Sequence, residues 1–134
     1  MSGPDVFFDS NVLLYLMSTG AKAARARSLL ERGGTVSVQV LNEIASVSRR
    51  KFALDWVEVH ELLGTIRMAC KVEPISMRTH ARGLGIAERF GFRVHDSMIV
   101  AAAIEAGCAT LFSEDMQHGQ RIERTTIRNP FAGA

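Results

Sequence analysis

The chain has 134 residues and a mass of 14.7 kDa, which is the size of one domain with one hydrophobic core. Hydrophobic residues make up 47% and charged residues 22%, so the composition excludes a disordered chain, a disulfide scaffold and a collagen-like fibre. No apolar run reaches the roughly 18 residues of a membrane span, and no Lys or Arg precedes the first apolar run as in a secretory signal. We therefore expect a single cytoplasmic domain over residues 1–134, with no membrane segment.

The charged residues and cysteines narrow the class of protein further. The net charge is +2, and all but Lys22, Lys51 and Lys71 of the 16 basic residues are arginines. Arginine makes bidentate contacts to phosphate, so this excess is compatible with an anionic partner, although solvated helix faces are the better explanation of this feature alone. Cys70 and Cys108 lie among apolar residues and are expected to be buried free thiols.

The first half of the chain alternates short strands with helices. Residues 5–9 are a short apolar run with aromatic and β-branched side chains, which predicts a buried strand. Ser10 and Asn11 are good capping residues, so a short helix is expected over residues 10–16. A second helix is predicted over residues 21–32 and is closed by two glycines. The alternating residues 35–38 then predict a strand.

The second half continues this alternation of helices and strands. Helices are expected over residues 40–51 and 54–69, followed by a strand over residues 71–74. A helix over residues 77–90, a further helix from residue 94 up to Gly107, and strands over residues 109–113 and 125–128 complete the series. This order predicts an α/β fold with three layers, in which helices flank a mostly parallel sheet of about five strands.

Several familiar catalytic motifs are absent. The chain has no phosphate-binding loop, no Cys-x-x-Cys pair and no Gly-x-Ser-x-Gly elbow. Gly83 and Gly85 lie within a helical pattern without the third glycine of a dinucleotide site, which favours close helix packing. The pair His60-Glu61 resembles the start of a zinc-protease motif, but Gly64 occupies the position of the second histidine. The chemistry must therefore come from other residue types.

Four acidic residues stand where strands meet helices or loops. Asp9 ends the first strand, Asp115 follows the fourth, Asp96 lies in the first turn of a helix, and Glu43 follows the second strand by one helical turn. Ligands of an open parallel sheet bind at the carboxyl ends of its strands, so these acids are expected to converge there. Because clustered carboxylates repel one another, a divalent cation is the usual partner, and an all-oxygen site favours Mg²⁺ or Mn²⁺.

Each acid also has a simpler interpretation when it is taken alone. Asp9 could cap the short helix, Asp96 could interact with the helix dipole, and Glu43 could be a solvated helix residue. Asp115 could form a turn, and its neighbour Glu114 could contribute to the site in its place. Only the joint placement of the four acids favours a metal site.

The residues around these acids resemble those of PIN-domain proteins, and more closely the VapC-type toxin ribonucleases of type II toxin–antitoxin modules. The resemblance covers residues 6–131 and rests on four segments: Phe8-Asp9-Ser10-Asn11-Val12-Leu13, Leu41-Asn42-Glu43, residues 95–103 beginning His95-Asp96-Ser97, and residues 111–116 containing Ser113-Glu114-Asp115. Two departures are notable. Many relatives have Tyr where this chain has His95, and Thr where it has Ser10.

The resemblance implies a PIN fold and an Mg²⁺- or Mn²⁺-dependent endoribonuclease. It implies that Asp9, Glu43, Asp96 and Asp115 hold the metal and that a cognate VapB-type antitoxin is the partner. It also implies a homodimer, which is common in this family. The alternative is a PIN-like module that binds protein or RNA without catalysis; the complete set of four acids argues against it. A titratable role for His95 beside the metal is a further hypothesis.

The same interpretation assigns roles to residues around the acids. Ser10 and Ser113 are candidates to orient the carboxylates. Without the four acids, sixteen basic residues face ten acidic ones, a net charge of +6 that would attract RNA. The densest basic run is Arg49-Arg50-Lys51, which could bind RNA phosphates or could simply complement the C-terminal end of its helix.

Overall fold

The structure is a computed structural model that describes residues 5–132, so residues 1–4 and 133–134 of the expected domain lie outside the described residues. The first half of the chain forms β1 (Val6–Phe8), α1 (Ser10–Leu13), the short 3₁₀ helix η1 (Leu14–Met17), α2 (Ala21–Glu31), β2 (Gly34–Ser37) and α3 (Val38–Phe52). The second half forms α4 (Trp56–Ala69), β3 (Cys70–Glu73), α5 (Met77–Phe90), α6 (Val94–Glu105), β4 (Thr110–Phe112), β5 (Arg121–Ile122) and β6 (Thr125–Arg128).

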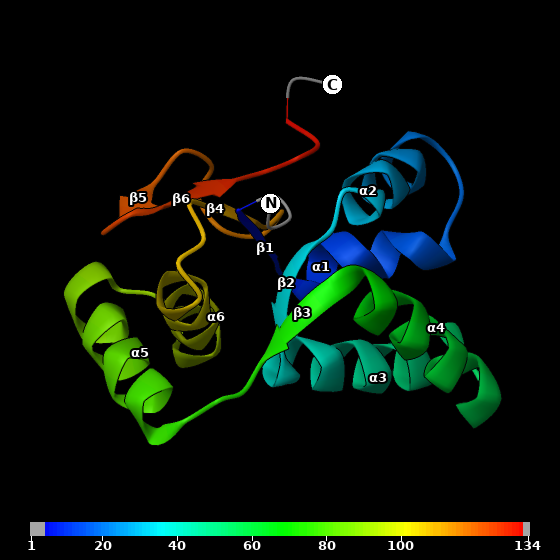
Figure 1. Ribbon diagram of the computed structural model, residues 1–134, viewed down its shortest axis with the longest axis horizontal. Coiled ribbons are helices and arrows are strands. Elements are labelled where there is room, and N and C mark those ends of the chain that lie inside the picture. The colour runs from blue at the N-terminus through cyan, green and yellow to red at the C-terminus, as the bar shows by residue number, and fades with distance from the viewer. Residues whose placement is uncertain (1–4, 133–134) are drawn as a thin grey trace.

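The strands form one six-stranded sheet in the order β3-β2-β1-β4-β6-β5. All neighbouring strands pair in parallel except β5 and β6, which form an antiparallel hairpin. Figure 1 shows α5 and α6 on one side of the sheet and α1 to α4 on the other. The expected α/β fold with a mostly parallel, helix-flanked sheet is thereby confirmed.

The structure adds one strand to the five that were expected. Strand β5 has two residues, Arg121 and Ile122, and a tight turn at Glu123 and Arg124 joins it to β6. Glu123 adopts a positive φ of 54°, which hairpin turns require and which glutamate seldom adopts. Because neither a hairpin sequence nor a long alternating run marks this segment, the pattern of residues gave no signal for it.

The core forms where the central strands meet the helices. Phe7 and Phe8 of β1 and Leu111 of β4 are completely buried, as are Ile44 of α3 and Ile99 of α6. The thiols of Cys70 and Cys108 are free and buried, and burial raises the pKa of each to about 11. The prediction of buried free thiols is thus confirmed.

Helices α5 and α6 pack closely at Gly83. A Cβ atom on this residue would lie 2.5 Å from Sδ of Met98 in α6, whereas one on Gly85 would meet no heavy atom within 4 Å. The expected close helix packing is therefore correct for Gly83 alone. This contact helps to fix α6, the helix whose first turn carries Asp96.

Strand β2 can lie close to β1 because Gly34 has no side chain. An added Cβ would lie 2.7 Å from Cε2 of Phe8 and 3.1 Å from the backbone oxygen of Val6.

Gly34→Ala is therefore expected to lower the free energy of unfolding by about 1–3 kcal/mol, the usual cost of overpacking. Gly64→Ala is the control, because Gly64 lies within α4 with open space around it. Its expected effect is a gain of up to about 1 kcal/mol from helix propensity. Urea unfolding of both variants measures the two changes, and equal shifts would contradict the packing argument.

Candidate active site

Asp9 lies at the carboxyl end of the central strand β1 and caps the N-terminus of α1. Its backbone is extended, and its Oδ1 accepts a 2.7 Å hydrogen bond from the backbone N–H of Ser10. The backbone N–H of Asp9 donates to the carbonyl of Phe112, so the residue is fixed to the neighbouring strand β4 as well as to α1. Only 4% of Asp9 is exposed. A carboxylate this deeply buried needs hydrogen-bond partners to remain charged.

Hydroxyl and amide groups supply these partners. The Ser113 hydroxyl, at the end of β4, donates a 2.9 Å hydrogen bond to Oδ2 of Asp9. The Asn11 amide lies 3.4 Å from the same oxygen and 3.3 Å from the Ser113 hydroxyl. The Ser10 hydroxyl contacts Oδ1 at 3.4 Å. The structure thus places both serines named from the sequence, Ser10 and Ser113, against Asp9.

Glu43 reaches the same place from α3. Ser37 caps this helix and accepts a hydrogen bond from the N–H of Val40, which sets Glu43 in the second turn. The Glu43 carboxylate accepts a hydrogen bond from the Ser10 hydroxyl, and its Oε2 lies 2.5 Å from Nε2 of His95. The Ser10 hydroxyl therefore lies between two acids that are 34 positions apart in the chain.

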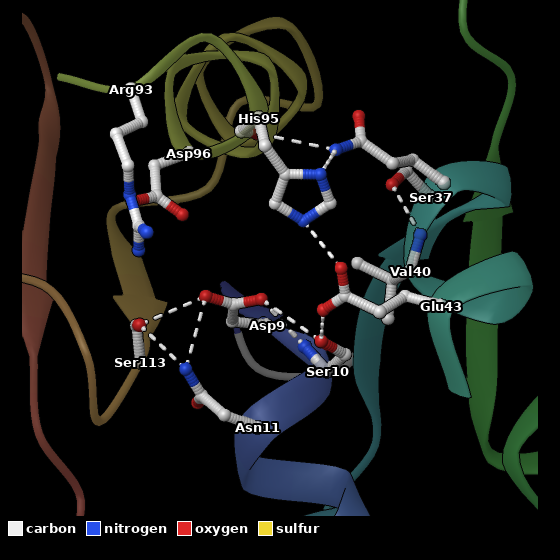
Figure 2. A network of polar contacts seen from close by, with 11 residues as sticks. Asp9, Ser10, Asn11, Ser37, Val40, Glu43, Arg93, His95, Asp96 and Ser113 are labelled. Atoms are coloured by element: carbon white, nitrogen blue, oxygen red, sulfur yellow. Dashed lines mark hydrogen bonds and ion pairs between the residues drawn. The ribbon is translucent and has the colours of Figure 1, made fainter. Parts of the chain in front are cut away.

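Asp96 approaches from the opposite side, in the first turn of α6 (Figure 2). Its side chain is 18% exposed, and its Oδ2 lies 3.5 Å from Nε of Arg93 in an i,i+3 pair. The neighbouring His95 is held by Gln39, whose amide nitrogen lies 3.1 Å from Nδ1 of the imidazole and 3.2 Å from the His95 carbonyl oxygen. Because the amide donates, Nδ1 accepts, and Nε2 carries the proton that points to Glu43.

The electrostatics of Asp9 show that these acids influence one another. The pKa of Asp9 is raised from 3.8 to about 6. Burial is the largest cause and the charges of Glu43 and Asp96 add to it, while the hydrogen bonds from Ser113 and Ser10 act in the opposite direction. Three carboxylates from three separate elements therefore share one region at the rim of the sheet, and their oxygen atoms are the donors that Mg²⁺ and Mn²⁺ prefer.

The family of the chain follows from comparison with known proteins. The model of the PIN domain matches residues 6–121, which is most of the chain. The chain belongs to the PIN domain family. A comparison with curated proteins found no match.

Three solved structures illustrate the similarity of the PIN fold. A toxin–antitoxin complex from Klebsiella pneumoniae superposes with a TM-score of 0.72 at 18% identity, covering 94% of this chain and 98% of that chain. Mycobacterium tuberculosis VapC20, a toxin that cleaves the sarcin–ricin loop, has a TM-score of 0.67 at 16% identity, with coverages of 82% and 89%. VapBC2 from Rickettsia felis, bound to a DNA fragment from its promoter, has a TM-score of 0.66 at 18% identity, with coverages of 92% and 96%. At these identities the similarity establishes the shared PIN fold.

Asp115, the fourth acid that the sequence predicts for this site, is placed differently from the other three. It is exposed in the loop that follows β4, and it is not among the charges that shift the pKa of Asp9. Across residues 5–132, no three His, Cys, Asp or Glu side chains stand close enough together to form a preassembled metal site. The structure therefore brings Asp9, Glu43 and Asp96 to one rim and leaves Asp115 on the adjoining loop.

The basic run of α3 has structural partners of its own. Arg49 lies in the last turn of this helix, donates a 2.9 Å hydrogen bond to the carbonyl of Leu54, and stacks 4.6 Å above the ring of Trp56. These contacts support the helix-end interpretation for Arg49. Arg50 and Lys51 are exposed and stay candidates for contact with phosphate.

Sequence reasoning missed two residues of this candidate site. Gln39 holds His95 and Arg93 pairs with Asp96, yet neither was a candidate. The i,i+3 spacing of Arg93 and Asp96 on one helix is a signal that could have identified that pair. No comparable signal exists for Gln39 and His95, because 56 positions separate them.

The raised pKa of Asp9 predicts how stability depends on pH in the metal-free protein. Between pH 3.8 and about 6 the folded state holds a proton that the unfolded state releases, so the free energy of unfolding falls as pH rises. The contribution of Asp9 to this fall is about 3 kcal/mol. Asp9→Asn removes the titration, so the stability of the variant relative to wild type should grow by most of this amount between pH 4 and pH 7. Urea unfolding in EDTA measures the difference, and parallel pH profiles would contradict it.

Proposed function

We propose that this PIN-domain protein is an endoribonuclease that depends on Mg²⁺ or Mn²⁺ and hydrolyses RNA phosphodiester bonds. The observation that carries the proposal is the buried Asp9 carboxylate at the rim of the sheet, whose pKa is raised by burial and by two further acids. A divalent cation fits this arrangement in charge and in donor type, since it would relieve the repulsion among the carboxylates.

Asp9 and Asp96 are the residues that we propose would bind the cation most directly. Asp115 would complete the site from its loop, and Glu43 would be an outer ligand or would orient the attacking water. The bound ion would supply activation of that water and neutralisation of charge on the scissile phosphate. Ser113 and Ser10 hold the Asp9 carboxylate in one orientation through hydrogen bonds at its two oxygens. Such partners of ligands typically contribute 10- to 100-fold to metal affinity or activity.

The biological role that we propose is that of a VapC-type toxin acting in the cytoplasm. This part of the proposal draws on the resemblance in sequence and on the solved structures of similar fold, two of which are toxin–antitoxin assemblies by name. A VapB-type antitoxin would be the partner and RNA the substrate, and the protein would form a homodimer of twice its 14.7 kDa mass. None of the helices within residues 5–132 is long and apolar enough to cross a membrane.

Cleavage of RNA in the presence of Mg²⁺ or Mn²⁺ tests the proposed activity. Chelation, Asp9→Asn and Asp96→Asn are each expected to lower the rate at least about 100-fold, because a metal ligand should matter more than its outer partners. Asp5→Asn is the matched control, since Asp5 is exposed and precedes β1. Equal cleavage in all samples would reveal a contaminating nuclease. If the wild type binds RNA but does not cleave it, the alternative of a non-catalytic binding module is favoured.

Growth of bacteria that express the protein tests the proposed toxin role. Wild type is expected to arrest growth, and co-expression of a small protein encoded beside it is expected to restore growth. Asp9→Asn should not arrest growth, because the variant keeps the fold and loses the carboxylate. Growth arrest by Asp9→Asn equal to that by wild type would contradict a toxicity based on catalysis.

A further inference from the structure

Glu114, which directly precedes Asp115, has contacts of its own for both of its carboxylate oxygens. Oε1 accepts a 2.6 Å hydrogen bond from the Tyr15 hydroxyl of η1, and Oε2 lies 2.5 Å from Nζ of Lys22 in α2. Burial tends to raise the pKa of Glu114, but the hydrogen bonds from Lys22 and Tyr15 outweigh it and keep the pKa below its ordinary value. Glu114 is therefore a charged anchor and not a member of the acid cluster.

The groups that hold Glu114 are themselves held in place. Nζ of Lys22 lies 5.2 Å from the centroid of the Tyr15 ring and 5.5 Å from that of Phe131. The two rings pack edge to face at 5.0 Å. The Lys22 side chain is 51% exposed and that of Glu114 is 22% exposed, so the ion pair is partly shielded from water. The anchor is thus a compact group built on η1, α2 and the chain after β6.

The backbone of Glu114 is tied to the acid site. Its N–H donates a 3.0 Å hydrogen bond to Oδ1 of Asn11. The amide nitrogen of the same Asn11 lies 3.3 Å from the Ser113 hydroxyl and 3.4 Å from Oδ2 of Asp9. The Ser113 hydroxyl in turn donates to that Asp9 oxygen at 2.9 Å. Glu114 therefore forms a link between two parts of the molecule. Its side chain contacts α2, and its main chain contacts the residues that orient Asp9.

This link lies at a point where the chain has no regular structure. Residues 113–120 lie between β4 and β5 and contain neither helix nor strand. The segment carries Ser113 at its start and Asp115 two positions later, so its placement decides where both side chains stand. Catalytic geometry is sensitive to displacements of about 1 Å, which makes a fixed attachment of this segment valuable.

We infer that Glu114 is a positioning residue: its attachment to Tyr15 and Lys22 fixes the start of the β4–β5 loop and thereby holds Ser113 and Asn11 on the Asp9 carboxylate. This inference rests on the proposed function, because it assigns Glu114 a role in the affinity of the same site for its metal. It also separates Glu114 from Asp115, which the proposed function keeps as a metal ligand.

The test compares Mn²⁺ affinity, measured by titration calorimetry, with the kinetics of RNA cleavage in variants of the anchor. Tyr15→Phe keeps the ring packing against Phe131 and removes only the hydroxyl, Lys22→Met removes the ammonium, and the two are also combined. The combined variant is expected to bind Mn²⁺ about tenfold more weakly and to lose about tenfold in kcat, with KM unchanged, as for other outer partners of a metal ligand. Glu114→Gln, which keeps an acceptor for Tyr15, should retain more affinity than Glu114→Ala.

Lys71→Met is the matched control, because Lys71 forms an exposed ion pair with Glu73 on the edge strand β3. It should leave Mn²⁺ affinity and kcat unchanged. If the anchor variants lose thermal stability but keep Mn²⁺ affinity and kcat within twofold of wild type, the role of the anchor is only structural and the inference is wrong. If the combined variant does not fold, the Mn²⁺ affinity and kcat of the two single variants decide whether the anchor positions the site.

The two proposals fail in different ways. Wild type that binds Mn²⁺ but cleaves no RNA would overturn the proposed function, and the Mn²⁺ affinities of the anchor variants would still decide the role of Glu114. Wild type that binds no Mn²⁺ would overturn both proposals.

Discussion

The burial of one carboxylate shapes the rest of this site. Asp9 is 4% exposed at the end of the central strand, where water cannot stabilise its charge. The Ser10 N–H and the Ser113 hydroxyl offset part of this cost, while Glu43 and Asp96 add to it through repulsion. The result is a carboxyl group whose pKa lies near 6, which is an unfavourable arrangement for stability alone and a favourable one for binding a cation.

The sheet order explains why these groups meet. Strand β1 lies at the centre of the sheet between β2 and β4, so the segments that follow all three strands emerge side by side at one rim. Asp9 follows β1, Ser113 follows β4, and α3 with Glu43 follows β2. Figure 2 shows α6 bringing Asp96 to the same rim from across the sheet. Parallel pairing of β1 with β4 is thus the physical reason that Ser113, 104 positions away in the chain, contacts the Asp9 carboxylate.

Two basic side chains distinguish this rim from a purely acidic one. His95 pairs with Glu43, and Arg93 pairs with Asp96. Both come from the N-terminal end of α6, which also carries the positive end of the helix dipole. Arg93 and the helix dipole therefore offset part of the negative charge that the three acids bring together, whereas His95 contacts Glu43 through Nε2.

The sequence by itself determined the class of fold and put Asp9 and Asp96 forward as candidates, because both follow from local chemistry. Apolar runs, caps and glycines mark strands and helices within a few residues, and Asp9 and Asp96 stand at such boundaries. The two-residue strand β5 and the division of the first helix into α1 and η1 had no such marks, since tertiary pairing and packing decide them. Only the tertiary structure decided that Glu114 faces Lys22 and not Asp9, that His95 meets Glu43, and that Asp115 is exposed on its loop. These outcomes depend on distances between elements far apart in the chain, and no local pattern of residues contains them.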